Sequence, residues 1–231
     1  MQPTRLMHGG RFLLIDLGAP HRMLSWAVLR GGLVEGRTVA WCHVADDELA
    51  PPVDPQSFLE ARLREAGCAD AVGLMTGAAL DAYVELERAA AGVEVRCVAT
   101  VGLENALRAG DPVGVDGAAP HAGTINVLCR ASVPLRDEAL LEALALAAEA
   151  RTLAVLEAGI RSRQSGRPAS GTGTDCLVVA APCGAAKVEY AGKHTVVGHL
   201  IGAAVGDAVA EGVRAWLARN GAHPRAAAVV P

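Results

Sequence analysis

The densest group of residues able to carry out chemistry is a polar, glycine-rich run at 165–175. It ends in Gly171, Thr172, Gly173, Thr174 and Asp175, directly before an apolar stretch. Glycines let backbone N–H groups approach a bound oxygen, threonine hydroxyls donate or accept hydrogen bonds, and the acid can act as a base or orient one. A plain turn is the alternative interpretation. The run is not a nucleotide-binding P-loop, because no Lys-Ser or Lys-Thr pair follows the glycines.

A second polar group lies within an otherwise apolar helical pattern. Glu149 and Thr152 are three residues apart, which places them on one face of a helix, with Arg151 beside them. A carboxylate among apolar neighbours is costly unless it is paired or used. We therefore expect either a functional carboxylate at Glu149 or a salt bridge that ties this helix to the glycine-rich run.

A third group stands at the start of the last helical pattern, where Lys193, His194 and Thr195 follow one another. Thr195 is a good N-cap, and the free N–H groups and dipole of a helix start favour an anion. The alternatives are an oxyanion or carboxylate site, or a cap at Thr195 with His194 simply exposed. Thr124 and Asn126 similarly place a hydroxyl and an amide at the start of a strand, either for function or to fix a loop.

The remaining histidines and the cysteines form no familiar catalytic or metal-binding pattern. The sequence contains no G-x-S-x-G, H-E-x-x-H or C-x-x-C motif and no Cys/His cluster with zinc-ligand spacing. Most of the six cysteines lie in apolar runs, which is typical of small buried thiols in a reducing compartment. We expect a cytoplasmic protein with no metal or cofactor of its own.

Periodicity predicts the elements that position these groups. In the N-terminal part we expect strands at 12–17, 23–29 and 37–44 joined by tight turns, and a helix from Pro55 that Asp54 caps. A short apolar run at 71–75, a helix at 77–91 capped by Thr76 and a strand at 93–101 follow. A Gly/Pro/Asp-rich surface loop is predicted at 108–122.

The second half alternates strands and helices. The pattern predicts strands at 124–133 and 176–181, a helix at 137–158 buried on more than one side, and a long C-terminal helix at 195–219. The predicted fold class is α/β, with α+β as the alternative. In either case we expect a mixed β-sheet packed by helices, with antiparallel strands at its N-terminal side.

Composition fits one globular domain over residues 1–231, with a loose tail at 221–231. The chain is 52% hydrophobic but only 3% aromatic, so its core must be built from small and aliphatic side chains. A net charge of −4 and a pI near 6.0 argue against a nucleic-acid partner. No uninterrupted apolar run reaches the roughly 18 residues of a membrane span, so we expect no membrane partner. A homo-oligomer is left open.

Seven stretches, in this order, resemble the CbiZ family of adenosylcobinamide amidohydrolases. They are LSWAVLRGG at 24–32, VGLMT at 72–76, ATVGLENA at 99–106, GTIN at 123–126, AEART at 148–152, GTGTD at 171–175 and YAGKHT at 190–195. Each is weak alone, but seven in sequence at family-like spacing argue against chance. Family members often show Thr-Glu-Ala-Lys-Thr at 148–152, and Ser-Asn where this chain has Glu104-Asn105.

The resemblance implies an enzyme of corrinoid salvage. Such an enzyme cleaves the amide joining the aminopropanol arm to the corrin ring of adenosylcobinamide, and releases adenosylcobyric acid for cobalamin synthesis. Some relatives also accept pseudo-type coenzymes. The substrate is a small-molecule corrinoid, and cobalt enters only as part of it. The alternative is a protein that binds or delivers the same corrinoid without cutting it.

The hypothesis for the site combines these groups around one scissile amide, attacked directly by water. Asp175 or Glu149 would be the general base, His194 would protonate the departing amine, and Thr174 is a lesser candidate for a nucleophile. Backbone N–H groups of the run at 171–174 would hold the oxyanion. The residues expected to bind substrate are Gly171, Thr172, Gly173, Thr124, Asn126, Asn105, Arg151, Thr152, Lys193 and Thr195.

Overall fold

The centre of the molecule is a mixed eight-stranded β-sheet. The computed structural model describes residues 5–45, 47–113, 123–185 and 188–221. The strands follow the order β4-β3-β2-β10-β8-β6-β5, and β1 pairs with β2 outside this path. Their bounds are β1 Arg5–Gly9, β2 Phe12–Ser25, β3 Gly32–His43, β4 Val72–Thr76, β5 Val84–Ala90, β6 Val93–Val101, β8 Ile125–Ala131 and β10 Cys176–Pro182. The predicted α/β class with a mixed sheet is confirmed.

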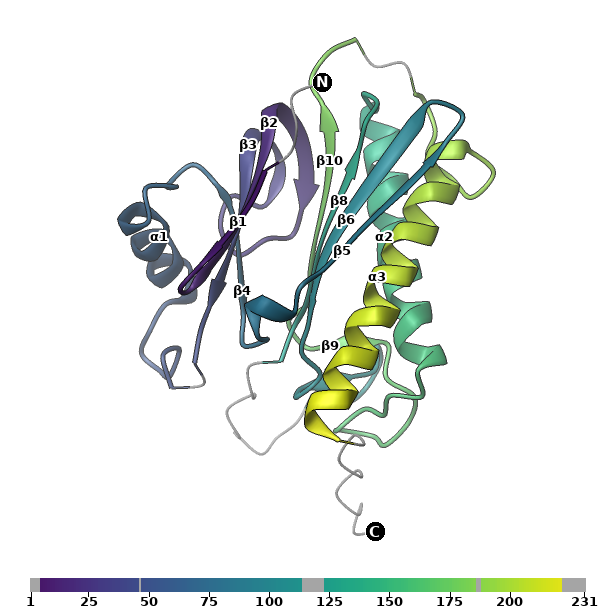
Figure 1. Cartoon of the computed structure of the whole chain (residues 1–231). Coiled ribbons are helices and arrows are strands. Elements are labelled where there is room, and N and C mark those ends of the chain that lie inside the picture. The colour runs from purple at the N-terminus through teal and green to yellow at the C-terminus, as the bar shows by residue number, and fades with distance from the viewer. Residues whose placement is uncertain (1–4, 46, 114–122, 186–187, 222–231) are drawn as a thin grey trace.

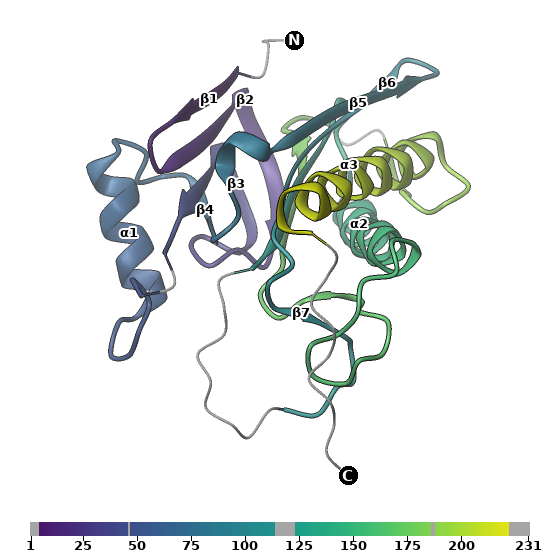
Figure 2. The same ribbon diagram turned by 60° about the horizontal axis from the view of Figure 1, so that its bottom comes forward.

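The sheet curls so that its two halves face each other. A core cluster fills the space between them, with Leu13 and Trp41 from one half and Val98, Leu128 and Val178 from the other, all at most 2% exposed. Helices cover the outer faces: α1 (Pro55–Glu65) on the side of β3 and β4, and α2 (Asp137–Glu157) with α3 (Val196–Asn220) on the other. Figure 1 shows these layers from left to right, and Figure 2 shows α2 and α3 side by side.

The first part of the sheet is more continuous than expected. In place of the two strands predicted at 12–17 and 23–29, the structure has one strand, β2, of 14 residues, which ends at Ser25. Its pairing register with β3 shifts between Asp16 and His21, so the Gly-Ala-Pro segment forms an irregularity within the strand and not a turn between strands. The Asp16 carboxylate stabilises this irregularity by accepting a hydrogen bond from the N–H of Gly18 at 2.8 Å.

The helix predicted at 77–91 is wrong. The structure has a short 3₁₀ turn at Leu80–Ala82 and then strand β5, which pairs antiparallel with β6 along its whole length. The hydroxyl of Thr76 does accept a hydrogen bond from the N–H of Ala78, as a cap would, but no helix follows. Val84, Leu86 and Arg88 alternate with more exposed residues, and this period of two is typical of a strand and not of a helix.

The other helices confirm their predicted ends. Asp54 accepts a hydrogen bond from Ser57 N to cap α1, and Thr195 accepts one from Gly198 N to cap α3. α2 ends at Glu157, and Gly159 follows with a φ of 71°. The expectation that α2 is buried on more than one side fails for Leu153 and Leu156, which are 53% and 36% exposed.

α3 is long and apolar enough to cross a membrane by length and composition, but 56% of that window is buried inside the protein. Since the core helix of a soluble protein meets the same criterion, this is weak evidence for a membrane span. The structure describes the predicted loop at 108–122 only as far as residue 113. Strand β7 ends at Leu107, and residues 108–113 form no helix or strand. The predicted loose tail lies outside the described residues beyond Gly221.

One end of the sheet gathers most of the sequence motifs. β8 and β10 are parallel and both begin there, while the antiparallel strands β6 and β2 end there. As a result Val101, Ile125, Cys176 and Ser25 lie at the same end. A small second sheet, β7 (Ala106–Leu107) with β9 (Gly171–Thr172), adjoins this end and holds the glycine-rich run.

Candidate active site

The glycine-rich run folds around the carboxylate of Asp175. Oδ1 of Asp175 accepts hydrogen bonds from Ile125 N at 3.0 Å and from the hydroxyl of Thr172. Oδ2 accepts from Thr172 N at 3.0 Å and from the guanidinium of Arg151. The side chain of Asp175 is only 6% exposed. This carboxylate therefore joins the turn, the start of β8 and helix α2.

Arg151 supplies the positive charge for this buried acid. Its side chain is 13% exposed, and burial lowers its pKa to about 10, which still leaves it a cation at neutral pH. The predicted salt bridge between the helix and the run is thus present, but it uses Arg151 and not Glu149. Thr152, on the next position of α2, donates its hydroxyl to the carbonyl of Ser170 at 3.1 Å. Two consecutive helix residues therefore hold the run.

Gly171 is required by the close approach of this ion pair. A methyl group on Gly171 would overlap the Arg151 guanidinium and the Asp175 carboxylate. Its φ of 153° is also a conformation that residues with side chains rarely adopt. The next glycine, Gly173, is exposed at the outer edge of the turn.

The hydroxyls of Thr124 and Thr174 lie against each other, with their Oγ1 atoms 2.8 Å apart. Thr124 is 5% exposed, whereas Thr174 is exposed. Within the described residues, no turn, loop or side-chain hydrogen bond uses the N–H of Thr174. The outer edge of the turn thus presents one hydroxyl and one backbone donor, the N–H of Thr174, to solvent.

Asn126 fixes strands and is not open to solvent. Its Nδ2 donates to Met75 O at 2.8 Å, its Oδ1 accepts from Cys176 N at 3.2 Å, and the residue is 0% exposed. The alternative considered for this residue, that it fixes a loop, fits this geometry better than substrate binding does. Its side chain bridges β10 to the end of β4.

Asn105 and Glu104 lie beneath the turn. Asn105 is 9% exposed, its Oδ1 has no partner among the described residues, and its Nδ2 is 3.7 Å from the point where a Cβ on Gly173 would lie. Glu104 accepts from Trp216 Nε1 at 2.9 Å through Oε1, while its buried Oε2 has no partner among the same residues. Gly102 and Gly123 leave room for that oxygen, because a Cβ on either would lie within 2.9 Å of it.

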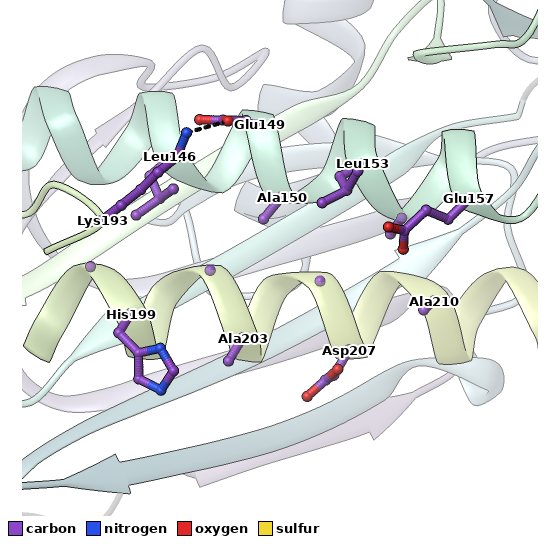
Figure 3. A pocket seen from close by; sticks show the side chains of 14 residues that line it. Leu146, Glu149, Ala150, Leu153, Glu157, Lys193, His199, Ala203, Asp207 and Ala210 are labelled. Carbon is purple, nitrogen blue, oxygen red and sulfur yellow. Dashed lines mark hydrogen bonds and ion pairs between the residues drawn. The ribbon is translucent and has the colours of Figure 1, made fainter.

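The groups at Glu149 and at 193–195 lie elsewhere. Glu149 forms an ion pair with Lys193, and both side chains are more than half exposed. Glu149 and Arg151 are two residues apart, about 200° around the helix, so they point in opposite directions. Figure 3 shows the Glu149–Lys193 pair at the edge of a groove of about 490 Å³ between α2 and α3. His194 is exposed, and no contact joins it to the turn within the described residues.

The structure therefore brings together Asp175, Thr172, Thr174, Thr124, Arg151 and Asn105, and separates them from Glu149 and Lys193. Thr195 caps α3. Among the described residues, no group of three or more His, Cys, Asp or Glu is arranged to hold a metal ion. The expectation that the protein has no resident metal therefore stays a prediction.

Sequence reasoning assigned no role to Trp26, which the structure places at this site. The indole Nε1 donates to the carbonyl of Asp175 at 2.6 Å, yet the residue is 44% exposed. Trp26 directly follows β2 and lies 149 residues before its partner, so no local sequence pattern links the two residues. Only the pairing of β2 with β10 brings them together.

Comparison of the chain with known proteins identifies its family. The family model described as adenosylcobinamide amidohydrolase matches residues 3–221. The chain belongs to this family. An adenosylcobinamide amidohydrolase of Halobacterium salinarum is 35% identical over 229 residues, which covers 94% of this chain and 89% of that protein. Protein MJ1613 of Methanocaldococcus jannaschii is 39% identical over 90 residues, 38% of this chain and 35% of that one. The enzyme is therefore a hydrolase of the amidohydrolase kind.

Two solved structures are similar at a lower level. The PH0078 protein from Pyrococcus horikoshii has a TM-score of 0.47 at 10% identity, covering 93% of this chain and 83% of its own. The L-aminopeptidase D-Ala-esterase/amidase from Ochrobactrum anthropi has a TM-score of 0.43 at 13% identity, covering 92% and 82%.

Proposed function

We propose that this enzyme hydrolyses the amide between the aminopropanol arm and the corrin ring of adenosylcobinamide, releasing adenosylcobyric acid for cobalamin salvage. Family membership supports the substrate class, and the turn at 171–175 supports the reaction type. The observation that carries the assignment is the contact between Thr172 and Asp175. It links a hydroxyl at the edge of the turn to a buried carboxylate beside the backbone N–H of Thr174.

The first step is attack by water on the amide carbon. Asp175 is too buried to touch that water directly, because its side chain is 6% exposed. Its hydrogen bond from the Thr172 hydroxyl offers an indirect route, in which the water gives its proton to Thr172 Oγ1 while Thr172 gives its own to Asp175. When the tetrahedral intermediate collapses, the C–N bond breaks and this proton returns through Thr172 to the departing amine nitrogen. Arg151 supplies the counter-charge to the Asp175 carboxylate and holds it in place.

The developing oxyanion is held at the outer edge of the turn. The N–H of Thr174 takes part in no turn, loop or side-chain hydrogen bond among the described residues, and Thr174 is exposed. The Thr174 hydroxyl lies at the same edge, where its contact with Thr124 Oγ1 at 2.8 Å fixes its position. In comparable enzymes, each such donor lowers the activation barrier by about 3 kcal/mol.

The proton acceptor is tested by release of aminopropanol from adenosylcobinamide. We expect Asp175→Asn and Thr172→Val to lower kcat by about 10²-fold or more, and Thr172→Ser to restore it. Thr172→Val leaves the Arg151–Asp175 ion pair intact, so it separates proton transfer from folding. Glu138→Gln, an exposed acid at the start of α2, is the control and should match the wild type. Full activity in both Asp175→Asn and Thr172→Val refutes the assignment.

The same assay distinguishes hydrolysis from mere binding. If the wild-type protein binds adenosylcobinamide but releases no aminopropanol, the chain is a binding or delivery protein and the reaction proposed above is wrong. We further propose that the enzyme acts in the cytoplasm without a resident metal. Activity should then survive extensive chelator treatment, and loss that zinc or another divalent ion restores would contradict it.

A further inference from the structure

Trp26 is an exposed aromatic side chain fixed to the turn of the proposed active site. Its Nε1 donates to Asp175 O at 2.6 Å, and its own carbonyl lies 3.5 Å from the thiol of Cys176. Two contacts therefore hold residue 26 against residues 175 and 176. The indole cannot turn away without losing a hydrogen bond, although 44% of the residue faces solvent.

The other two tryptophans of the chain behave differently. Trp41 is 0% exposed and Trp216 is 5% exposed, and each lies in a core cluster. Burial is the usual outcome for so large an apolar surface, because about 25 cal/mol per Å² is gained by removing it from water. Trp26 forgoes much of that gain at the end of the sheet where the turn lies.

We propose that Trp26 is a substrate-binding residue whose indole packs against a planar, unsaturated ring of the corrinoid. The proposal rests on the proposed function, since it uses the same turn. The indole N–H is already satisfied by Asp175 O, so the ring offers only an apolar face, which suits a conjugated ring and not a hydrogen-bonding arm. The corrin ring and the adenine of the adenosyl group both have this chemistry.

Steady-state kinetics on adenosylcobinamide test the proposal. We expect Trp26→Ala to raise KM about 10-fold or more with a much smaller change in kcat, because lost ground-state binding appears in KM. Trp26→Phe keeps an aromatic face but loses the hydrogen bond to Asp175, and should stay near the wild-type KM. Leu141→Ala, 60% exposed on the solvent side of α2, is the control for removing exposed apolar surface.

A structural role for Trp26 gives a different pattern. If the hydrogen bond to Asp175 is what matters, Trp26→Phe and Trp26→Ala lose kcat and melting temperature to the same extent, and the proposal is overturned. Wild-type KM in Trp26→Ala also overturns it. Asp175→Asn, assayed in parallel, tells this failure from a failure of the site: an inactive Asp175→Asn with a normal Trp26→Ala removes only the role of Trp26.

Cobinamide without the adenosyl group identifies the ring. Binding can be followed by the visible spectrum of the corrin, whether or not this compound is cleaved. If Trp26 packs against the corrin, Trp26→Ala weakens binding of both corrinoids by a similar factor. If it packs against adenine, only the adenosylated compound is affected. Equal binding of both compounds by the wild type and Trp26→Ala contradicts the proposal.

Discussion

Arg151 and Asp175 form an ion pair between helix α2 and the glycine-rich turn, with side chains only 13% and 6% exposed. Asp175 also accepts three further hydrogen bonds, from Ile125 N and from the backbone and hydroxyl of Thr172. The acid is therefore the point at which the helix, β8 and the turn meet. Removing either partner would leave a buried charge without its counterion.

We expect Arg151→Met to destabilise the protein by about 3–5 kcal/mol, because Asp175 would remain buried without a cation. Chemical denaturation measures the change in the free energy of unfolding. Arg64→Met is the matched control, since Arg64 pairs with Glu60 on the exposed face of α1 and both side chains are more than half exposed. That variant should lose at most about 0.5 kcal/mol. Equal losses would mean that the buried pair contributes no more than a surface pair.

We expect Gly171→Ala to lower both stability and activity, because the added methyl overlaps the ion pair and the φ of 153° is unfavourable for alanine. A loss of at least about 2 kcal/mol is anticipated. Gly202→Ala serves as control, since a Cβ there meets nothing within 4 Å and lies within α3. It should stabilise the protein by up to about 1 kcal/mol, the helix-propensity difference. Thermal melts and the aminopropanol assay give both readouts, and an active, stable Gly171→Ala would rule out this packing.

Trp216→Phe should cost more than Trp41→Phe. Trp216 Nε1 donates to Glu104 Oε1, whose other oxygen has no partner among the described residues, so the phenylalanine would leave that buried carboxylate without this donor. Trp41 Nε1 is buried and has no hydrogen-bond partner among the described residues, so replacing Trp41 breaks no hydrogen bond there. We expect a difference of about 1–3 kcal/mol between the two variants. Denaturant unfolding of both proteins checks it, and equal losses would contradict it.

His21 should make the protein less stable in mild acid. It is 1% exposed, its Nδ1 lies 2.8 Å from Ala19 O, and its Nε2 accepts from Arg130 Nε at 3.0 Å, which requires the neutral ring. Burial is the largest cause of the lowered pKa of His21; the hydrogen bond to the Ala19 carbonyl opposes it, and the charge of Arg130 lowers the pKa by a smaller amount. Below about pH 6.5, the unfolded value, the unfolded chain binds the extra proton first. This contribution to stability is therefore present above that pH and is lost as the pH falls.

The pH effect is measured by unfolding between pH 7.5 and about pH 5. Wild type should lose stability over this range more steeply than His21→Gln, whose amide can accept from Arg130 and donate to Ala19 without titrating. Parallel curves for the two proteins would show that His21 does not titrate differently in the folded state.

Local sequence was enough for the caps and for most elements. Asp54, Thr195 and Gly159 mark helix ends because capping depends on the nearest few residues. The same dependence on near neighbours explains the wrong prediction after Thr76, where the cap signal suggested a helix. Pairing of β5 with β6 overrode it, since strand partners come from elsewhere in the chain.

The sequence by itself determined the family, the glycine-rich run and the residue types that can stabilise an oxyanion. Tertiary structure alone decided which of them meet. Helix geometry turns Arg151 toward Asp175 and Glu149 toward Lys193, although the two are neighbours in sequence. The pairing of β2 with β10 brings Trp26 to the turn across 149 residues. Register between distant strands depends on packing of the whole sheet, which no local pattern encodes.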